Sequence, residues 1–197
     1  MNYTYNLTEE ICRWSFEVHV KKLESWWVAF TNPTAGPWKK IESYNKNNKK
    51  GEVFRYERDA QRPDLIIVND DLKTIIIFEA KDDLFKLNIK NQIEKTSKVI
   101  DDMNNILTKI DNEFWNNRNT YNTFLGLLWG SETLSIKKDI LKTFKNYSDC
   151  LRKKNTKINV ENIIGIEVTK KNENIILNFH TDSDQENSNK ILNSFKS

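Results

Sequence analysis

Several residue types that mark particular protein classes are scarce in this sequence. Its 197 residues include five glycines, three prolines and two cysteines, Cys12 and Cys150. Such small numbers exclude collagen-like and proline-rich chains, and no glycine-rich phosphate-binding loop is present. Two cysteines cannot form a disulfide framework, which fits a reducing compartment, and we therefore expect a cytoplasmic protein.

Long hydrophobic runs are missing as well. No stretch approaches the ~18 consecutive apolar residues that indicate a membrane span. The first residues, MNYTYNLTEEICRW, lack the basic start and apolar run of a secretory signal. We therefore expect no membrane association.

The formal net charge of +3 is only mildly basic, below the strong bias of an obligate nucleic-acid binder. Basic residues nevertheless gather in the segments 46–62 and 137–157. These two segments are either ordinary solvated faces or surfaces that contact phosphates.

Hydrophobic and aromatic residues are abundant enough for a packed core, at 38% and 11% of the chain. We expect one domain over residues 1–197. Thr8 and the acids after it predict the start of a helix that runs to about Trp27. The apolar residues of this helix lie on more than one face. Residues 31–50 predict a long loop, and 51–59 a strand.

The segment RPDLIIVNDDLKTIIIFEAK, residues 62–81, carries the clearest pattern. Two runs rich in β-branched residues, 65–68 and 74–78, flank a polar turn, which predicts a β-hairpin. Because both faces of each run are apolar, we expect central strands that are covered on both sides.

The remaining chain alternates predicted helices and strands. In order, the pattern predicts a helix over 84–110, a strand over 123–129, a basic helix over 133–152, strands over 163–168 and 175–179, and a polar tail over 182–197 that is either flexible or ends in a short helix. The fold class is therefore α/β, with a central mixed β-sheet flanked by helices on both faces.

The hairpin brings chemically active residues together at its open end. If Asn69 pairs with Thr74, Asp64 faces Glu79 on the neighbouring strand. Two carboxylates at the ends of buried strands repel one another, and a divalent cation would remove that cost. Because side chains alternate along a strand, Lys81 shares the face of Glu79.

Ala80 lies between these two residues and points to the opposite face, with its carbonyl near the carboxylates. Two carboxylates and one backbone carbonyl are the hard oxygen ligands that Mg²⁺ prefers, with Mn²⁺ able to substitute. Lys81 can orient or help deprotonate an attacking water and balance charge on phosphorus.

Pro63-Asp64 followed by Glu79-Ala80-Lys81 resembles the motif of the PD-(D/E)XK nuclease superfamily. The resemblance implies a restriction-endonuclease-like core and metal-dependent cleavage of phosphodiester bonds. It also implies that Asp64 and Glu79 are catalytic metal ligands together with the carbonyl of Ala80, and that Lys81 is the catalytic lysine.

The resemblance covers roughly residues 8–130. Many members add a glutamate from the helix before the hairpin, which implies Glu17 as a further catalytic residue and Glu10 as the second choice. Gln92 stands where some members carry a polar active-site residue. Thr96 replaces the tyrosine of the Gln-xxx-Tyr signature of one branch, so we do not expect membership of that branch.

These features predict a magnesium-dependent endonuclease acting on double-stranded DNA, either a type II restriction endonuclease or its small cleavage subunit. Because one site cuts one strand, we expect a homodimer, or a heterodimer with a recognition or second-strand subunit. Weaker nucleic-acid contacts are predicted at Arg55, Arg62, Gln92, Lys137, Lys138 and Lys145. The alternatives are a repair, recombination or toxin nuclease of the same fold, or a non-catalytic nucleic-acid-binding protein.

Overall fold

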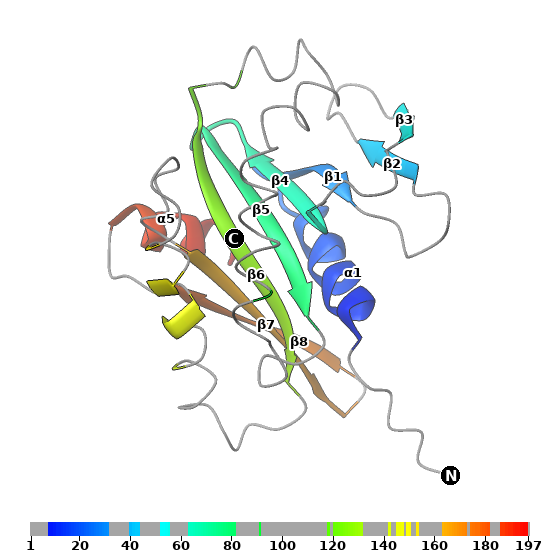
Figure 1. The fold of residues 1–197 in the computed structure, drawn as a ribbon, viewed down its shortest axis with the longest axis vertical. Coiled ribbons are helices and arrows are strands. Elements are labelled where there is room, and N and C mark those ends of the chain that lie inside the picture. Colours follow the sequence, from blue (N-terminus) through cyan, green and yellow to red (C-terminus); the bar gives the residue numbers. More distant parts are fainter. Residues whose placement is uncertain are drawn as a thin grey trace.

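The protein is an α/β structure built on a mixed β-sheet (Figure 1). The computed structural model describes residues 8–31, 40–43, 52–55, 63–81, 91, 118, 120–131, 142, 145–147, 149–150, 153, 163–172, 174–181 and 186–196. The elements are α1 (Glu9–Val20), β1 (Trp27–Thr31), β2 (Lys40–Ser43), β3 (Glu52–Arg55), β4 (Leu65–Asn69), β5 (Thr74–Lys81), β6 (Asn122–Ser131), β7 (Ile163–Lys171), β8 (Asn174–Thr181) and α5 (Glu186–Ser194).

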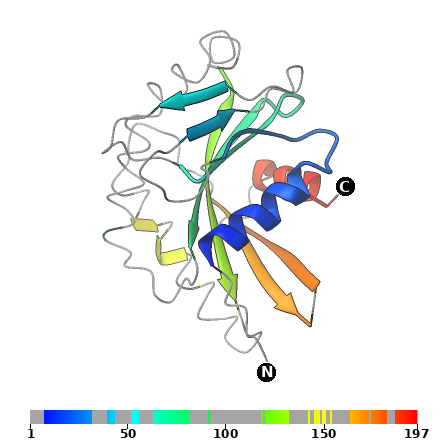
Figure 2. The same cartoon turned by 90° about the vertical axis from the view of Figure 1, so that its right-hand side faces the viewer.

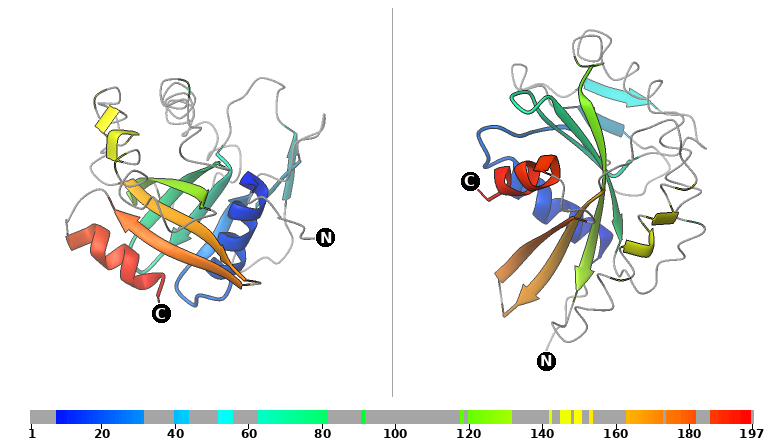
Figure 3. Two further views of the ribbon diagram at one scale, coloured as in Figure 1. Left: turned by 90° about the horizontal axis from the view of Figure 1, so that it is seen from below. Right: turned by 90° about the vertical axis from the view of Figure 1, so that its left-hand side faces the viewer.

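The eight strands lie in the order β3-β2-β1-β4-β5-β6-β7-β8. The pairs β5–β6 and β6–β7 are parallel, and the other pairs are antiparallel. Strands β2 and β3 lie at one end of the sheet, and β7 and β8 at the other (Figure 3). Strands β4 and β5 are central and almost wholly buried, which confirms their predicted position.

The hairpin between β4 and β5 has the predicted register. Asn69 pairs with Thr74, and the ladder continues to Leu65 opposite Phe78. In the turn, the Asn69 side chain accepts a hydrogen bond from the Leu72 amide at 2.8 Å. Local turn chemistry of this kind fixes the register, because the asparagine oxygen replaces a backbone acceptor.

Helix α1 begins as predicted but ends earlier. The Thr8 hydroxyl accepts a hydrogen bond from the Ile11 amide, and acidic residues occupy the first turn. The helix ends at Val20 rather than near Trp27, where strand β1 already begins. The apolar residues that seemed to occupy several faces of one helix therefore belong to a helix and a buried strand.

The predicted loop over 31–50 is wrong for residues 40–43, which form β2 between β1 and β3. The sequence of this strand, KIES, has no apolar run that would distinguish it. Its structure depends on antiparallel pairing with two neighbouring strands, and such non-local pairing is not visible in local sequence. Strand β3 lies within the predicted strand 51–59.

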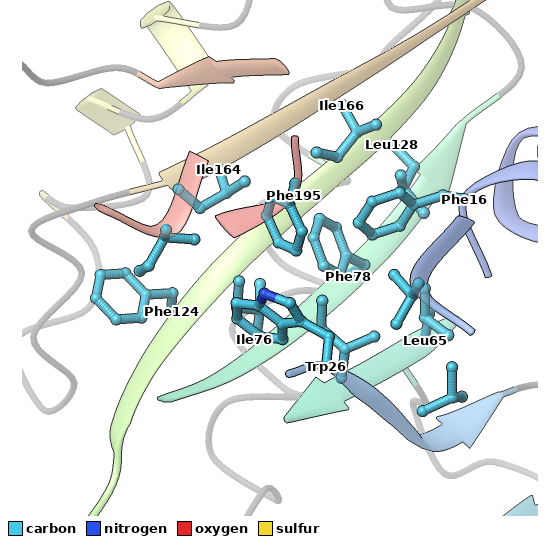
Figure 4. Packing of buried hydrophobic residues seen from close by; sticks show 14 of the residues in the cluster. Phe16, Trp26, Leu65, Ile76, Phe78, Phe124, Leu128, Ile164, Ile166 and Phe195 are labelled. Atoms are coloured by element: carbon cyan, nitrogen blue, oxygen red, sulfur yellow. The ribbon is translucent and has the colours of Figure 1, made fainter. Parts of the chain in front are cut away.

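Helices α1 and α5 lie on the same face of the sheet (Figure 2). Beneath them, aromatic rings from distant parts of the chain pack together (Figure 4). The Phe16 ring meets the Phe78 ring edge-on with centroids 5.1 Å apart, and the rings of Trp26 and Phe195 stack at 4.8 Å. The segment after residue 182 therefore contains the short helix, and its end completes the core.

Other helix predictions fall largely outside the described residues. Of the predicted helix over 84–110, only Asn91 is described, and it is helical. The described residues between 142 and 153 are helical, with Tyr147 buried and Lys145 exposed. Coverage of both sheet faces by helices stays a prediction. Within the described ranges, no helix is both long and apolar enough to cross a membrane.

Candidate metal and active site

The carboxyl end of β5 carries the predicted motif on two opposite faces. Ala80 is 1% exposed and belongs to the core cluster that includes Phe16 and Phe78. Its neighbours Glu79 and Lys81 therefore project from the other face, since side chains alternate along a strand. The small side chain of Ala80 packs beneath α1, and the two charged groups stay clear of the aromatic core.

Asp64 is tied to β5 by two hydrogen bonds. Its amide donates to the Phe78 carbonyl at 2.9 Å, and its Oδ2 accepts the Ala80 amide at 2.7 Å. The paired positions of the ladder end at Leu65, so the Asp64 backbone bonds beside Phe78 instead of pairing with Glu79. The carboxylate nevertheless reaches β5 between the two charged motif residues, and no hydrogen bond to its Oδ1 is formed by another described residue.

The Lys81 ammonium lies among oxygen atoms. Its Nζ donates to the Ala80 carbonyl at 2.6 Å and to Glu9 Oε1 at 3.3 Å, and it lies 3.8 Å from Glu79 Oε2. Burial lowers the pKa of Lys81, but the negative charges of Glu79, Glu9 and Asp64 outweigh burial and raise it above its ordinary 10.5. Lys81 therefore carries its proton at neutral pH.

The oxygen atoms around Lys81 leave an excess of negative charge. Three carboxylates, those of Asp64, Glu79 and Glu9, act on one ammonium, so the formal charge of the group is −3 + 1 = −2. A divalent cation would balance that charge. Its ligands would be hard oxygen atoms, which fits Mg²⁺.

The protein ligands available to such an ion are few. In the described part of the chain, no three histidine, cysteine, aspartate or glutamate side chains converge closely enough to hold a metal ion. The site therefore offers Asp64, Glu79 and the Ala80 carbonyl, and leaves the other positions to water or phosphate. Mg²⁺ is commonly held in this way, through one or two carboxylates with waters and substrate phosphates.

The structure does not bring Glu17 to this group. Its carboxylate accepts hydrogen bonds from Lys21 at 2.6 Å, from Thr31 at 2.9 Å and from Arg13 at 3.3 Å, beneath strand β1. Two cations and a hydroxyl already satisfy this buried carboxylate, which gives it a structural role. Glu10, the second choice, is exposed.

Glu9 is the helix α1 carboxylate that reaches the site, and the sequence argument missed it. Its place in the first helical turn was explained by the helix dipole alone. Glu17 lies eight residues further on, about 12 Å along the helix axis. The sequence could have indicated Glu9 only through its position at the start of the helix, if that start was expected to lie near the end of β5.

A second polar group lies on the same sheet face as Lys81. Lys81 pairs with Trp129, and Trp129 pairs with Glu167, so the register sets the three in one row. The His180 ring stacks on Trp129 at 5.5 Å, and its Nε2 lies 3.2 Å from Glu167 Oε2. The sequence does not indicate this group, because the parallel β6–β7 pairing that aligns the row is not visible in local sequence.

Most of the predicted nucleic-acid contacts cannot be located. Arg62, Gln92, Lys137 and Lys138 lie outside the described residues. Arg55 is the last residue of β3, and its backbone pairs with Lys40. Lys145 is helical and exposed. These contacts stay predictions.

Comparison with known proteins found no relative of this chain. No protein-family model, curated protein or solved structure matches this chain.

Proposed function

We propose that this protein is a magnesium-dependent endonuclease that hydrolyses phosphodiester bonds of double-stranded DNA on a restriction-endonuclease-like core. One observation carries the proposal: at the end of a central strand, the Asp64 carboxylate is bound to the Ala80 amide, and the partly exposed Lys81 ammonium lies against the Ala80 carbonyl and Glu79. A cation thus already lies against two of the oxygen donors that would bind Mg²⁺, the Ala80 carbonyl and Glu79, and the group retains the charge to hold a divalent one.

Each residue has a chemical role in this proposal. Asp64 Oδ1, the Glu79 carboxylate and the Ala80 carbonyl would hold Mg²⁺ or Mn²⁺, which would polarise the phosphate and lower the pKa of a bound water. Lys81, as an ammonium, donates a hydrogen bond to the attacking water or a phosphate oxygen and stabilises the negative charge that develops on phosphorus.

Lys81 and the proposed ion would share one ligand. Because the ammonium donates to the Ala80 carbonyl at 2.6 Å, use of that carbonyl by an ion requires the ammonium to turn away. Glu9 Oε1, which lies 3.3 Å from the same ammonium, offers it a second acceptor. Once the ammonium had turned from the carbonyl, its contact with Glu9 would keep Lys81 beside the site.

The biological role that we propose is restriction, by a type II enzyme or its small cleavage subunit in the cytoplasm. One centre cuts one strand, so double-strand cleavage requires a homodimer or a heterodimer with a recognition or second-strand subunit. A repair, recombination or toxin nuclease would use the same centre. Site-specific cutting of plasmids distinguishes restriction from cleavage of branched DNA or RNA.

The deciding experiment is cleavage of supercoiled plasmid with Mg²⁺ and with chelator. We expect the wild type to cut only with the metal, and Lys81→Ala to lose at least about 100-fold in rate, as when one charge-stabilising donor is removed. Lys190→Ala removes an exposed lysine on α5 and should cut like the wild type. Equal rates for the wild type and Lys81→Ala would remove Lys81 from the reaction.

Metal binding separates the nuclease from its non-catalytic alternative. Added Mg²⁺ or Mn²⁺ should raise the melting temperature of the wild type, since an ion that binds only the folded state stabilises it. Asp64→Asn should reduce that shift, because it removes a ligand and a negative charge. If the wild type shows no shift and no cleavage, a non-catalytic nucleic-acid-binding protein becomes the better explanation.

A further inference from the structure

Among the described residues, strand β8 is an edge of the sheet. Within the described residues it pairs with β7 alone (Figure 3), and Asn174, Ile175 and Ile176 are exposed. Its sequence, NIILNFHT, contains no lysine, arginine, aspartate, glutamate or proline. Natural edge strands usually carry such residues because they prevent another strand from pairing with the free backbone groups. Strand β8 has no such protection.

The exposed large hydrophobic side chains of the described residues gather beside this edge. They are Trp14, which is 61% exposed, Ile175 at 41% and Ile176 at 39%. Trp14 of α1 and Ile175 of β8 line one groove of about 380 Å³ together with Val18 and Leu177. A strand added beside β8 would cover Ile175 and Ile176, and its side chains on the α1 side would approach Trp14.

The charges on either side of β8 select the direction of an added copy. In the sequence, Lys170, Lys171 and Glu173 precede the strand, and Asp182, Asp184 and Glu186 follow it, so the formal charge is net positive before the strand and negative after it. When two identical strands pair antiparallel, the beginning of each, where the net charge is positive, lies beside the acidic end of the other. Parallel pairing would instead bring like charges together. The strand itself is uncharged, so no repulsion opposes self-pairing.

We propose that two copies of this chain associate through antiparallel pairing of their β8 strands. The pairing is two-fold symmetric, so each copy offers the same surface to the other, as in most homodimers. Backbone hydrogen bonds give the pairing its direction, and burial of Ile175, Ile176 and Trp14 stabilises it. The inference goes beyond the nuclease proposal and does not depend on it.

Sedimentation equilibrium of the full chain tests this association. The wild type should be dimeric at micromolar concentration. Ile176→Lys places a charge at the paired edge of both copies and should raise the dissociation constant by about 30-fold or more, as loss of a central interface residue does. Thr120→Lys adds the same charge at an exposed position before β6, and its dimer should persist.

A second variant and a second measurement distinguish a weakened dimer from a misfolded protein. Trp14→Ala changes a mostly exposed side chain and should weaken the dimer without lowering the melting temperature. Hydrogen exchange should show that amides of residues 174–181 become protected as concentration rises. A wild type that stays monomeric at high micromolar concentration overturns the proposal, as does an Ile176→Lys variant that remains folded and fully dimeric.

Discussion

Glu9 Oε1 lies 3.3 Å from the Lys81 ammonium, although 72 positions separate the two residues in the chain. This contact joins the first turn of α1 to the end of the central strand β5. It places a helix carboxylate beside the proposed metal ligands, whereas Glu17 contacts Thr31 beneath β1. The two glutamates of one helix therefore have separable roles.

Matched substitutions should separate these roles. Glu9→Gln should leave the free energy of unfolding within about 1 kcal/mol of the wild-type value, because the ion pair between Glu9 and Lys81 is partly exposed. It should raise the Mg²⁺ concentration needed for half-maximal cleavage about 10-fold, the cost of losing a residue that supports metal ligands. A titration of cleavage rate against Mg²⁺ measures this effect.

Glu17→Gln should show the opposite result. The substitution leaves Arg13 and Lys21 without the buried carboxylate between them, and should reduce the free energy of unfolding by about 2–3 kcal/mol. Urea unfolding measures the loss. The Mg²⁺ dependence of the folded variant should match the wild type, and a shift in it would contradict the structural role assigned to Glu17.

The contacts of Asp70 at the hairpin turn predict that the protein loses stability in acid. Its carboxylate accepts hydrogen bonds from Arg118 at 2.8 Å, Tyr121 at 3.0 Å and Trp27 at 3.2 Å. Although burial raises the pKa of Asp70, hydrogen bonds and charge from Arg118, with Tyr121 and Trp27, hold it below its ordinary 3.8. A carboxyl with a depressed pKa stabilises the fold above its unfolded-state pKa, and this stability is lost as pH falls through the folded-state value.

Asp70→Asn should therefore have a lower melting temperature than the wild type at pH 7. On acidification, the melting temperature of the variant should fall by less than that of the wild type. Thermal unfolding between pH 7 and pH 2 measures both effects. Asp71→Asn is the matched control, because Asp71 is exposed in the same turn. A constant difference between Asp70→Asn and the wild type down to the lowest pH would show that the carboxylate charge is not responsible.

The close contact of β5 with β6 leaves no room for a side chain at Gly126. It pairs with Phe78, and a Cβ atom at position 126 would overlap the Phe78 ring. Gly126→Ala should therefore reduce the free energy of unfolding by about 1–3 kcal/mol, the usual cost of overpacking a core. Asn122→Ala, at the exposed start of β6, serves as the control. Chemical denaturation of both variants checks the prediction, and equal stability would mean that the ring moves at little cost.

Phe195 makes the end of the described chain part of the core. Its ring is fully buried and stacks on Trp26. Phe195→Ala should lower the free energy of unfolding by about 3–5 kcal/mol, whereas Lys196→Ala, at an exposed position, should have little effect. Urea denaturation distinguishes the two. A flexible tail would make both substitutions neutral.

The hairpin could be predicted from sequence because its determinants are local. Two β-branched runs and a short polar turn predict the hairpin, and the assumed pairing of Asn69 with Thr74 is the one that the structure has. The alternation of side chains along β5 follows from the strand itself. The candidate site follows from the same local pattern, since Asp64 directly precedes β4, and Glu79 and Lys81 lie in β5. The extension of α1 to Trp27 was wrong because helix and strand residues share the same apolar character.

The sequence by itself determined the central hairpin and the acidic and basic residues at its open end, because neighbouring residues set strand pairing there. Only the tertiary structure decided that Glu9 rather than Glu17 reaches Lys81, that residues 40–43 form a strand, and that Phe195 enters the core. Each of these features depends on the contact of segments far apart in the chain, and no local pattern of residues specifies which distant surface a helix or strand will meet.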